Sequence, residues 1–413
     1  MQTKTVAIIG SGVVGLSTAI SLLEAGYKVT LIDKEKPGQG ASFGNAGLFA
    51  DYACLPFTKF ALLKKMPGML LDSSSPLSMQ TSYLPNLVPY GLGFVKSCTR
   101  EKYEQGKQAL TSLQKIAYES TDKLLRLSDS QNLVKANGCL ALIASEQDLS
   151  DAKQGDMLER QQSGVRLDFL SAHDVSDLEP DLARFYAGGV FYPDTRFTVS
   201  PVSISQNYAR YFSEKGGVLL QDVAQEVIPD SQRVAITLSD QTLTFDQVVI
   251  CAGVASKALL KPLGFNFPLV SERGYHLTLD LGEKQISRPV GWLDKAVFLT
   301  PMADGVRLAG TAEFAHADAP AELSRTNTML KHASTMLGNE PEVVSSWVGS
   351  RPSTPDSLPV IGTLKNHPRV NLAFGHGHLG LTFAAATGQL IKEIINNEQT
   401  SVDITPFAPE RFS

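Results

Sequence analysis

Three glycines and one acid near the N-terminus have the spacing of a nucleotide-binding motif. Gly10, Gly12 and Gly15 follow an apolar, β-branched stretch, Thr5–Ile9, and precede apolar residues at helical spacing. Glycine at these places allows a tight turn, close approach of a pyrophosphate and close packing of helix on strand. Asp33 ends the next strand-like stretch, where an acid accepts bonds from ribose hydroxyls. We therefore predict a dinucleotide-binding βαβ unit rather than a glycine-rich turn without a ligand.

A second stretch of small residues, Gly38–Phe49, favours FAD over NAD as the dinucleotide. It follows the second predicted strand closely. Ser42 and Asn45 can bond phosphate and polar flavin atoms, while Ala46 and Gly47 leave room for a flat ring. The alternative is a flexible surface loop.

A third stretch, Phe374–Ile391, runs from the end of a predicted strand through two Gly-His pairs into a helix. The N-terminus of this helix places positive potential near residues 380–382. Reduced flavin is an anion at its pyrimidine end, so this placement would stabilise it. His376 and His378 either line the site or only cap the turn.

A single arginine, Arg351, lies in the proline-rich stretch Gly349–Gly362. Proline fixes φ, so we expect a stiff loop that holds the arginine in place. A guanidinium group matches a carboxylate with two parallel hydrogen bonds, which fixes orientation as well as affinity. We expect Arg351 to bind a substrate carboxylate. The alternative is a salt bridge to Asp356 that braces the loop.

Another candidate, Tyr275, lies in a predicted strand beside His276. Successive side chains on a strand face opposite ways, so one of the two enters the pocket while the other supports the sheet. We favour Tyr275 in the pocket, because its hydroxyl could bond a carboxylate beside an apolar substrate.

The composition of the chain excludes several classes of protein. A chain of 413 residues predicts two domains. The net charge is −5 and no basic run is present, which argues against nucleic-acid binding. The four cysteines form no CxxC pair, which indicates free thiols in a reducing compartment and no structural zinc. No sequence feature indicates an oligomeric state.

The charge-free run Thr5–Leu23 could be confused with a signal peptide or a membrane span. Its three glycines instead predict a buried strand, a turn and a buried helix. No other run is long and apolar enough to span a bilayer, so we expect a cytoplasmic protein.

The order of the predicted elements indicates two interwoven domains. Strand-rich blocks interrupt a chain that returns to the βαβ pattern at its end. We predict an α/β protein with a Rossmann-like FAD-binding domain and an α+β substrate domain built on an antiparallel sheet. The FAD-binding domain comprises segments 1–55, 196–255 and 341–413, and the substrate or cap domain comprises segments 56–195 and 256–340.

The segment Leu55–Cys98 is apolar, contains lysines and few acids, and has no strict period. An exposed apolar patch often marks a membrane or partner surface. We predict peripheral contact with the inner face of the cell membrane and electron transfer to a quinone. The alternative is a lid that covers a domain.

Taken together, the motifs carry a family resemblance along essentially the whole chain. The stretches GSGVVG…LIDKE, GASFGNAGL, VVICAG, RPSTPDSLPVIG and GHGHLGLT occur in the order found in the D-amino-acid oxidase superfamily of flavoenzymes. Within it, the chain resembles bacterial D-amino-acid dehydrogenases of the small-subunit type, and among these the branch acting on cis-4-hydroxy-D-proline.

The resemblance implies non-covalent FAD, because relatives with covalent flavin use a cysteine in the late loop and this chain has Arg351-Pro352-Ser353 there. Backbone contacts to the cofactor are implied at Val223 and Gly253. With the motifs above, the candidate cofactor-binding residues are Gly10, Gly12, Val13, Val14, Gly15, Asp33, Lys34, Ala41, Ser42, Asn45, Ala46, Gly47, Leu48, Val223, Ala252, Gly253, Gly377, His378, Leu379, Gly380, Leu381 and Thr382.

The implied activity is oxidation of a D-amino acid or cyclic D-imino acid, with cis-4-hydroxy-D-proline or D-proline favoured. The Cα hydride passes to flavin N5, the imine hydrolyses to the 2-oxo acid, and the electrons leave to a quinone. The candidate catalytic residues are Arg351, Tyr275 and His378. No Glu or Asp base is evident, and none is required if the amine loses its proton before binding. The alternatives are an oxygen-using oxidase of glycine or N-methyl amino acids, and a non-catalytic dinucleotide-binding module.

Overall fold

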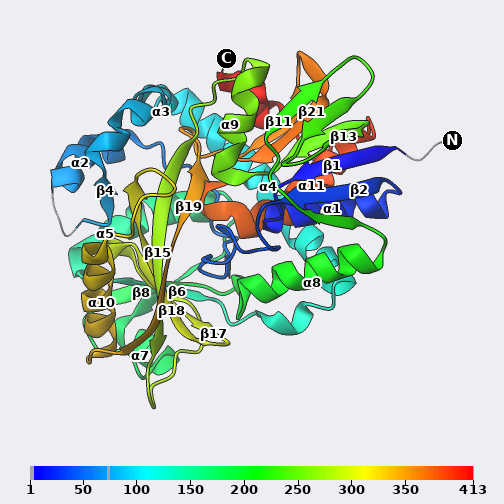
Figure 1. Ribbon diagram of the computed structural model, residues 1–413. Helices are drawn as coiled ribbons and strands as arrows, with labels where there is room; N and C mark the ends of the chain where they lie inside the picture. The colour runs from blue at the N-terminus through cyan, green and yellow to red at the C-terminus, as the bar shows by residue number, and fades with distance from the viewer. Residues whose placement is uncertain (1–3, 72–74, 413) are drawn as a thin grey trace.

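Two large sheets organise the computed structural model, which describes residues 4–71 and 75–412 (Figure 1). The first sheet has six strands, parallel except at the edge strand β20. In spatial order its strands are β10 (Val218–Gln221), β2 (Lys28–Asp33), β1 (Thr5–Ile9), β14 (Gln247–Ile250), β21 (His367–Phe374) and β20 (Val360–Leu364).

Layers cover both faces of this sheet, as continuous apolar strands require. Val6 and Ile8 pack into a core with the helices on one face, while Ala7 and Ile9 pack into a second core on the other. The helices are α1 (Val13–Glu24), α4 (Arg100–Leu127), α8 (Pro201–Glu214) and α11 (Gly380–Ile395). The second face carries α9 (Ser256–Leu260) and a small antiparallel sheet of β11 (Glu226–Pro229), β12 (Val234–Thr237) and β13 (Thr242–Phe245).

The second sheet has nine strands and is mostly antiparallel. In spatial order the main path is β19 (Glu342–Ser353), β15 (Val270–Asp280), β18 (Gly305–Phe314), β17 (Val297–Met302), β16 (Val290–Trp292), β6 (Cys139–Ile143), β8 (Gly188–Tyr192) and β7 (Asp168–Ser171), with β4 (Leu77–Met79) paired to β18. Helices α10 (Leu323–Leu337) and α7 (Ala172–Leu178) supply core residues to one face. The predicted combination of an α/β nucleotide-binding fold with an antiparallel sheet is confirmed.

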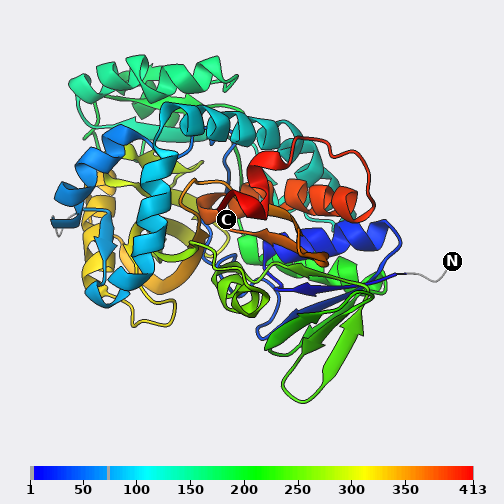
Figure 2. The ribbon, with the colours of Figure 1, turned by 90° about the horizontal axis from the view of Figure 1, so that it is seen from above.

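Short elements connect the two sheets. A three-stranded sheet is formed by β3 (Leu48–Phe49), β9 (Arg196–Thr198) and β5 (Val134–Lys135). Helices α5 (Glu146–Gln154) and α6 (Asp156–Gln162) follow β6. Figures 1 and 2 place α2 (Phe60–Leu71) and α3 (Leu84–Ser97) at the outer edge of the molecule, beside the nine-stranded sheet.

The structure departs from the expected assignments at β19 and α4. Strand β19, expected in the FAD-binding domain, pairs with β15 of the nine-stranded sheet over its whole length. Arg351 therefore lies in a strand and not in a loop, because the ladder continues past it through Pro352 and Ser353. Helix α4, expected in the substrate domain, packs its apolar face with α1 and α11.

Among the described residues, no helix combines the length and the apolar character needed to cross a membrane.

Candidate active site

A cavity of about 1160 Å³ runs from the N-terminus of α1 to strand β19 of the nine-stranded sheet. Its walls come from the carboxyl ends of β1, β2, β14 and β21, and from the loop between β2 and β3. The carboxyl ends of parallel strands are where ligands bind in open α/β sheets. The cavity therefore joins a nucleotide-binding edge to the nine-stranded sheet.

The nucleotide end of the cavity is built from backbone. Gly10 has φ +110°, and a Cβ atom there would lie 2.4 Å from the Cys251 carbonyl oxygen. A Cβ on Gly15 would lie 1.8 Å from the Gly10 carbonyl oxygen, so glycine alone permits the close contact of β1 with α1. This glycine-lined approach to the N-terminus of α1 is the shape that a dinucleotide pyrophosphate requires, and the residues fit FAD.

Two side chains order this end. Ser42 Oγ accepts a hydrogen bond of 2.9 Å from the Val13 amide in the first turn of α1. Asp33 Oδ2 accepts from the Ser11 amide at 2.6 Å and from the Ser11 hydroxyl at 2.9 Å. Asp33 also lines the cavity, at the end of β2 where a ribose hydroxyl would be bound.

Most of the candidate cofactor-binding residues line this cavity. Three do not: Gly15, Gly47 and Thr382 lie behind the lining. Gly15 serves helix packing, Gly47 takes φ +81° at a turn, and Thr382 Oγ1 accepts from the Ala50 amide at 3.0 Å. The lining residues are Gly10, Gly12, Val13, Val14, Asp33, Lys34, Ala41, Ser42, Asn45, Ala46, Leu48, Val223, Ala252, Gly253, Gly377, His378, Leu379, Gly380 and Leu381.

At the other end of the cavity, Arg351 and His378 meet a carboxylate, Glu272 of β15. Arg351 Nη1 donates to the Thr311 carbonyl at 3.1 Å and lies 3.4 Å from Glu272 Oε1. His378 Nε2 lies 2.7 Å from the same oxygen, and Ser353 Oγ donates to Glu272 Oε2 at 2.7 Å. Segments 272, 351–353 and 378, far apart in the sequence, thus form one polar cluster.

Glu272 is buried and ionised. Burial alone would raise its pKa, but His378, Arg351 and the hydrogen bond from Ser353 lower it to about 2. A carboxylate of such low pKa accepts protons poorly near neutral pH. It therefore acts as a charge partner of Arg351 and not as a general base.

Sequence reasoning missed Glu272. The only available signal was its register, since Glu272 pairs directly with Arg351 in the β15–β19 ladder. That pairing is not visible without knowing that the two strands are neighbours. The alternative partner, Asp356, instead binds Arg411, with 2.7 Å between Asp356 Oδ2 and Arg411 Nε.

The placement of Tyr275 differs from the expectation. Its side chain points away from the cavity into the core beneath α10, where its hydroxyl donates to Glu313 Oε2 at 2.7 Å. His276 faces the opposite way and stacks on Trp347, with ring centroids 5.2 Å apart. The predicted alternation is present, but neither residue lines the cavity, and His276 instead faces the loop between β2 and β3.

The remaining wall near Arg351 is apolar. Its lining includes Leu48, Tyr52, Leu293, Phe298, Ala309 and Val348.

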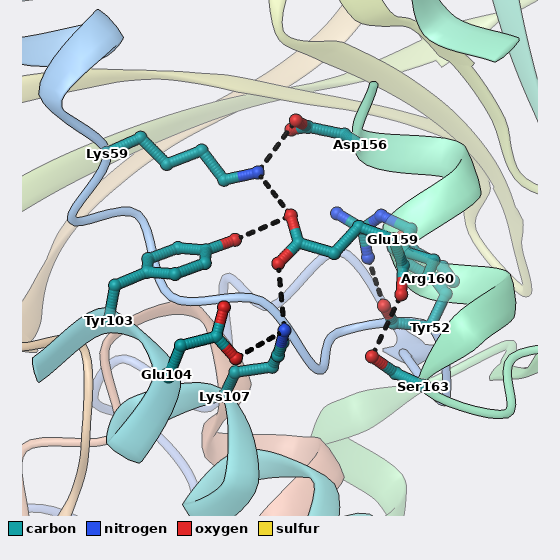
Figure 3. Close-up of polar contacts among 9 residues, drawn as sticks. All are labelled: Tyr52, Lys59, Tyr103, Glu104, Lys107, Asp156, Glu159, Arg160 and Ser163. Carbon is teal, nitrogen blue, oxygen red and sulfur yellow. Dashed lines mark hydrogen bonds and ion pairs between the residues drawn. The ribbon is translucent and has the colours of Figure 1, made fainter. Parts of the chain in front are cut away.

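A charged cluster lies beside the cavity, which two of its members, Lys59 and Asp156, line; Figure 3 shows its contacts. Lys59, which precedes α2, donates to Asp156 Oδ1 at 2.7 Å and to Glu159 Oε2 at 3.0 Å. Tyr103 of α4 donates to the same Glu159 oxygen at 2.9 Å, and Lys107 binds the other oxygen at 3.2 Å. These contacts fasten the start of the α2–α3 segment to α4 and α6 beside the cavity.

Comparison with known proteins gives a family. The FAD dependent oxidoreductase family (DAO) matches residues 5–394. The chain is 32% identical to the D-amino-acid oxidase of Bradyrhizobium diazoefficiens, with alignment over 100% of this chain and 99% of the relative. It is 28% identical to the D-amino acid dehydrogenase of Vibrio vulnificus, over 95% and 96% of the two chains.

Solved structures share the fold. Glycine oxidase from Geobacillus kaustophilus superposes with a TM-score of 0.76 at 20% identity, covering 98% of each chain. L-proline dehydrogenase from P. horikoshii superposes with a TM-score of 0.75 at 16% identity, covering 99% of this chain and 98% of the other.

The family match spans both ends of the cavity, the glycine-rich end that fits FAD and the Arg351 end. The match favours an oxidoreductase over a non-catalytic dinucleotide-binding module. The superfamily predicted from the sequence motifs is confirmed. The chain belongs to the DAO family of FAD-dependent oxidoreductases.

Proposed function

We propose that the protein oxidises D-amino acids or cyclic D-imino acids, with D-proline and cis-4-hydroxy-D-proline favoured. The observation that carries this proposal is Arg351, whose guanidinium lines the FAD-sized cavity opposite an apolar wall. A planar fork of N–H donors suits a carboxylate, and the wall suits a carbon ring. The names of the relatives, D-amino-acid oxidase and D-amino acid dehydrogenase, support the same substrate class.

FAD, when bound, supplies the hydride acceptor, its N5 atom. The residues of the chain bind and orient the substrate. Arg351 holds the carboxylate, so that Cα–H keeps one direction, and the apolar wall excludes water around the carbon that reacts. The substrate carbon loses a hydride and its neutral nitrogen loses a proton, which leaves an imine for hydrolysis in water.

Glu272 and His378 prepare Arg351 for this role. Glu272 compensates the arginine charge before substrate arrives, and His378 and Ser353 hold Glu272 in place. A substrate carboxylate then joins a site whose positive charge is already positioned. His378, with 41% of its side chain exposed, lines the cavity together with Arg351 and can also meet substrate directly.

An anaerobic substrate panel tests the proposal. The purified holoenzyme is mixed with D-, L- and N-alkyl amino acids, and flavin bleaching is followed in the absence of oxygen. We expect the cyclic D-imino acids to reduce the flavin fastest and their L-enantiomers to leave it oxidised. Fastest reduction by glycine or sarcosine, followed by rapid reoxidation in air, would favour the oxidase alternative instead.

We further propose that electrons leave to a membrane quinone and that α3 contacts the membrane. Leu84, Val88, Leu92 and Val95 lie along one face of α3 and are 44–63% exposed. Phe57 and Phe60 add exposed aromatic rings close to the start of α2, and lysines outnumber acids between residues 56 and 99. An apolar helix face flanked by lysines suits an anionic lipid surface.

The lid alternative has support of its own, because Phe57 packs 5.5 Å from the ring of His378. Flotation with vesicles containing anionic lipid separates the two. We expect the holoenzyme to float, and a Val88→Glu, Leu92→Glu double variant to stay in solution with unchanged flavin reduction. The lid would remain as the function of α3 if the holoenzyme does not float and its reduced flavin is not reoxidised by a soluble quinone.

A further inference from the structure

Arg307 of β18 is a buried cation that forms no ion pair within the described residues, where Asp304 is the acid that acts on its charge from a longer distance. Its residue is 4% exposed, and its Nε finds no hydrogen-bond partner. Among the described residues, no carboxylate oxygen lies within 4.0 Å of its guanidinium, in contrast to the buried Arg273, which pairs with Glu313 at 3.2 Å. An uncompensated buried charge is costly. Such a group calls for a role beyond packing.

The Arg307 guanidinium binds the loop that lines the cavity between β2 and β3. Nη1 donates to the Phe43 carbonyl at 2.9 Å and to the Asn45 carbonyl at 2.7 Å. His276 Nδ1 lies 3.4 Å from the carbonyl between them, that of Gly44. Three successive carbonyls of this loop thus point toward the nine-stranded sheet.

Peptide geometry fixes what faces the other way. In a trans peptide the C=O and the following N–H point in opposite directions, and the chain has no cis peptide among its described residues. Holding the Phe43 and Asn45 carbonyls therefore turns the amides of Gly44 and Ala46 away from Arg307. Gly44 and Ala46 both line the cavity.

These two amides are free. Within the described chain neither finds an acceptor, whereas their neighbours do: the Asn45 amide donates to the Ser42 carbonyl at 3.5 Å and the Gly47 amide to Asn45 Oδ1 at 2.7 Å. Trp347 closes the loop from behind, since a Cβ on Gly44 would lie 1.9 Å from its ring. The loop is therefore held in one conformation with two donors available.

We propose that Arg307 is a positioning residue that directs the amides of Gly44 and Ala46 at acceptor atoms of the flavin ring, and that its buried positive charge favours the reduced cofactor. Two-electron reduction with uptake of one proton leaves the ring with one negative charge. Hydrogen-bond donors and a nearby cation stabilise that state relative to the oxidised one.

The test is the flavin midpoint potential of purified holoenzyme, with FAD affinity and melting temperature measured in parallel. Arg307→Met removes charge and donors while keeping a linear side chain. Arg307→Lys keeps the charge. Arg325→Met is the matched control, because Arg325 is 8% exposed and donates to a backbone carbonyl, that of Ser75, away from the flavin loop.

We expect Arg307→Met to weaken the preference for reduced flavin at least tenfold, which is a fall of about 30 mV for a two-electron couple. The midpoint potential should fall less in Arg307→Lys. Arg325→Met should lose stability without a change in potential. If Arg307→Met fails to retain FAD, Arg307→Lys carries the test. A potential unchanged in the Arg307 variants that retain FAD, with stability lowered as in Arg325→Met, would reduce Arg307 to a brace. A change in substrate affinity alone would indicate that the two amides bind substrate and not the flavin, and it would overturn the proposal.

Discussion

The two ends of the cavity are built in different ways. The nucleotide end relies mainly on backbone and glycine, and its principal motifs follow one another closely between Thr5 and Leu48, with further lining from the ends of β14 and β21. The substrate end uses charged side chains on β15, β19 and the turn before α11, separated by many residues of chain. One end is therefore set by local conformation, and the other by which strands become neighbours.

This difference implies different responses to substitution. Changes at the nucleotide end should alter cofactor affinity by steric conflict and leave substrate chemistry intact. Changes at the substrate end should alter electrostatics and orientation while FAD remains bound.

The largest effect is expected at Arg351. Arg351→Ala removes two charge-assisted hydrogen bonds to the carboxylate, so kcat/KM for the best substrate should fall about a thousandfold. Arg351→Lys keeps the charge without the fork and should weaken substrate binding by about one to two orders of magnitude. Steady-state kinetics with parallel FAD content measures both. An Arg351→Ala enzyme that loses stability yet keeps its substrate affinity would show that the arginine is only a brace.

Removal of Glu272 should have a nearly equal effect, but on the unfolding free energy and not on kcat/KM. Glu272→Ala leaves the Arg351 guanidinium without its counter-charge, and we expect the unfolding free energy to fall by about 3 kcal/mol. A substrate-like carboxylate should then raise the melting temperature more in the variant than in the wild type, because it replaces the missing charge.

The matched control for Glu272 is Glu179, which is buried and paired with Arg288 at 2.7 Å; Arg288, unlike Arg351, does not line the cavity. Glu179→Ala should lose comparable stability and gain no response to carboxylate. If carboxylate raises the melting temperature of the two variants equally, Glu272 has no part in substrate binding.

At the nucleotide end, Gly10→Ala should weaken FAD binding about a hundredfold, since the new methyl group meets the Cys251 carbonyl and the residue holds a positive φ. Gly26→Ala separates the two causes: Gly26 has φ +90° but no heavy atom near a Cβ position. Gly26→Ala should lower stability and leave the affinity for FAD unchanged. Fluorescence titration of apoprotein with FAD measures the affinities, and equal affinities for the two variants would contradict a steric cradle.

A smaller effect concerns pH. Burial lowers the pKa of His376 to about 3, below its ordinary 6.5, so the unfolded chain binds one more proton between these values. The contribution of His376 to stability is present above pH 6.5 and is lost as the pH falls, by about 1.4 kcal/mol per pH unit. His376→Gln should flatten the pH dependence of the unfolding free energy by that amount.

The same contrast explains what could be predicted from the sequence. The βαβ unit, Gly10, Gly12 and Asp33 were predictable because each role depends on residues within one short segment. Backbone chemistry of this kind leaves its mark in spacing and composition.

Glu272 and the orientation of Tyr275 were not predictable, because both depend on sheet pairing. A strand's period gives two faces without saying which one meets the cofactor. Arg351 shows the intermediate case: its residue type indicated a carboxylate site, yet its place in a strand and its partner required the β15–β19 register. Arg307 has no local motif, and its significance depends on a loop more than 250 residues earlier in the chain.

The most direct measurement compares two affinities in one variant. FAD and cyclopentanecarboxylate, a ring carboxylate that lacks the amine and cannot be oxidised, are titrated into wild-type protein and Arg351→Ala. Flavin fluorescence reports the first Kd and flavin absorbance the second. An unchanged Kd for FAD with loss of carboxylate binding is expected if backbone holds the cofactor and Arg351 holds the substrate. Retained carboxylate affinity in Arg351→Ala would contradict this division of the cavity.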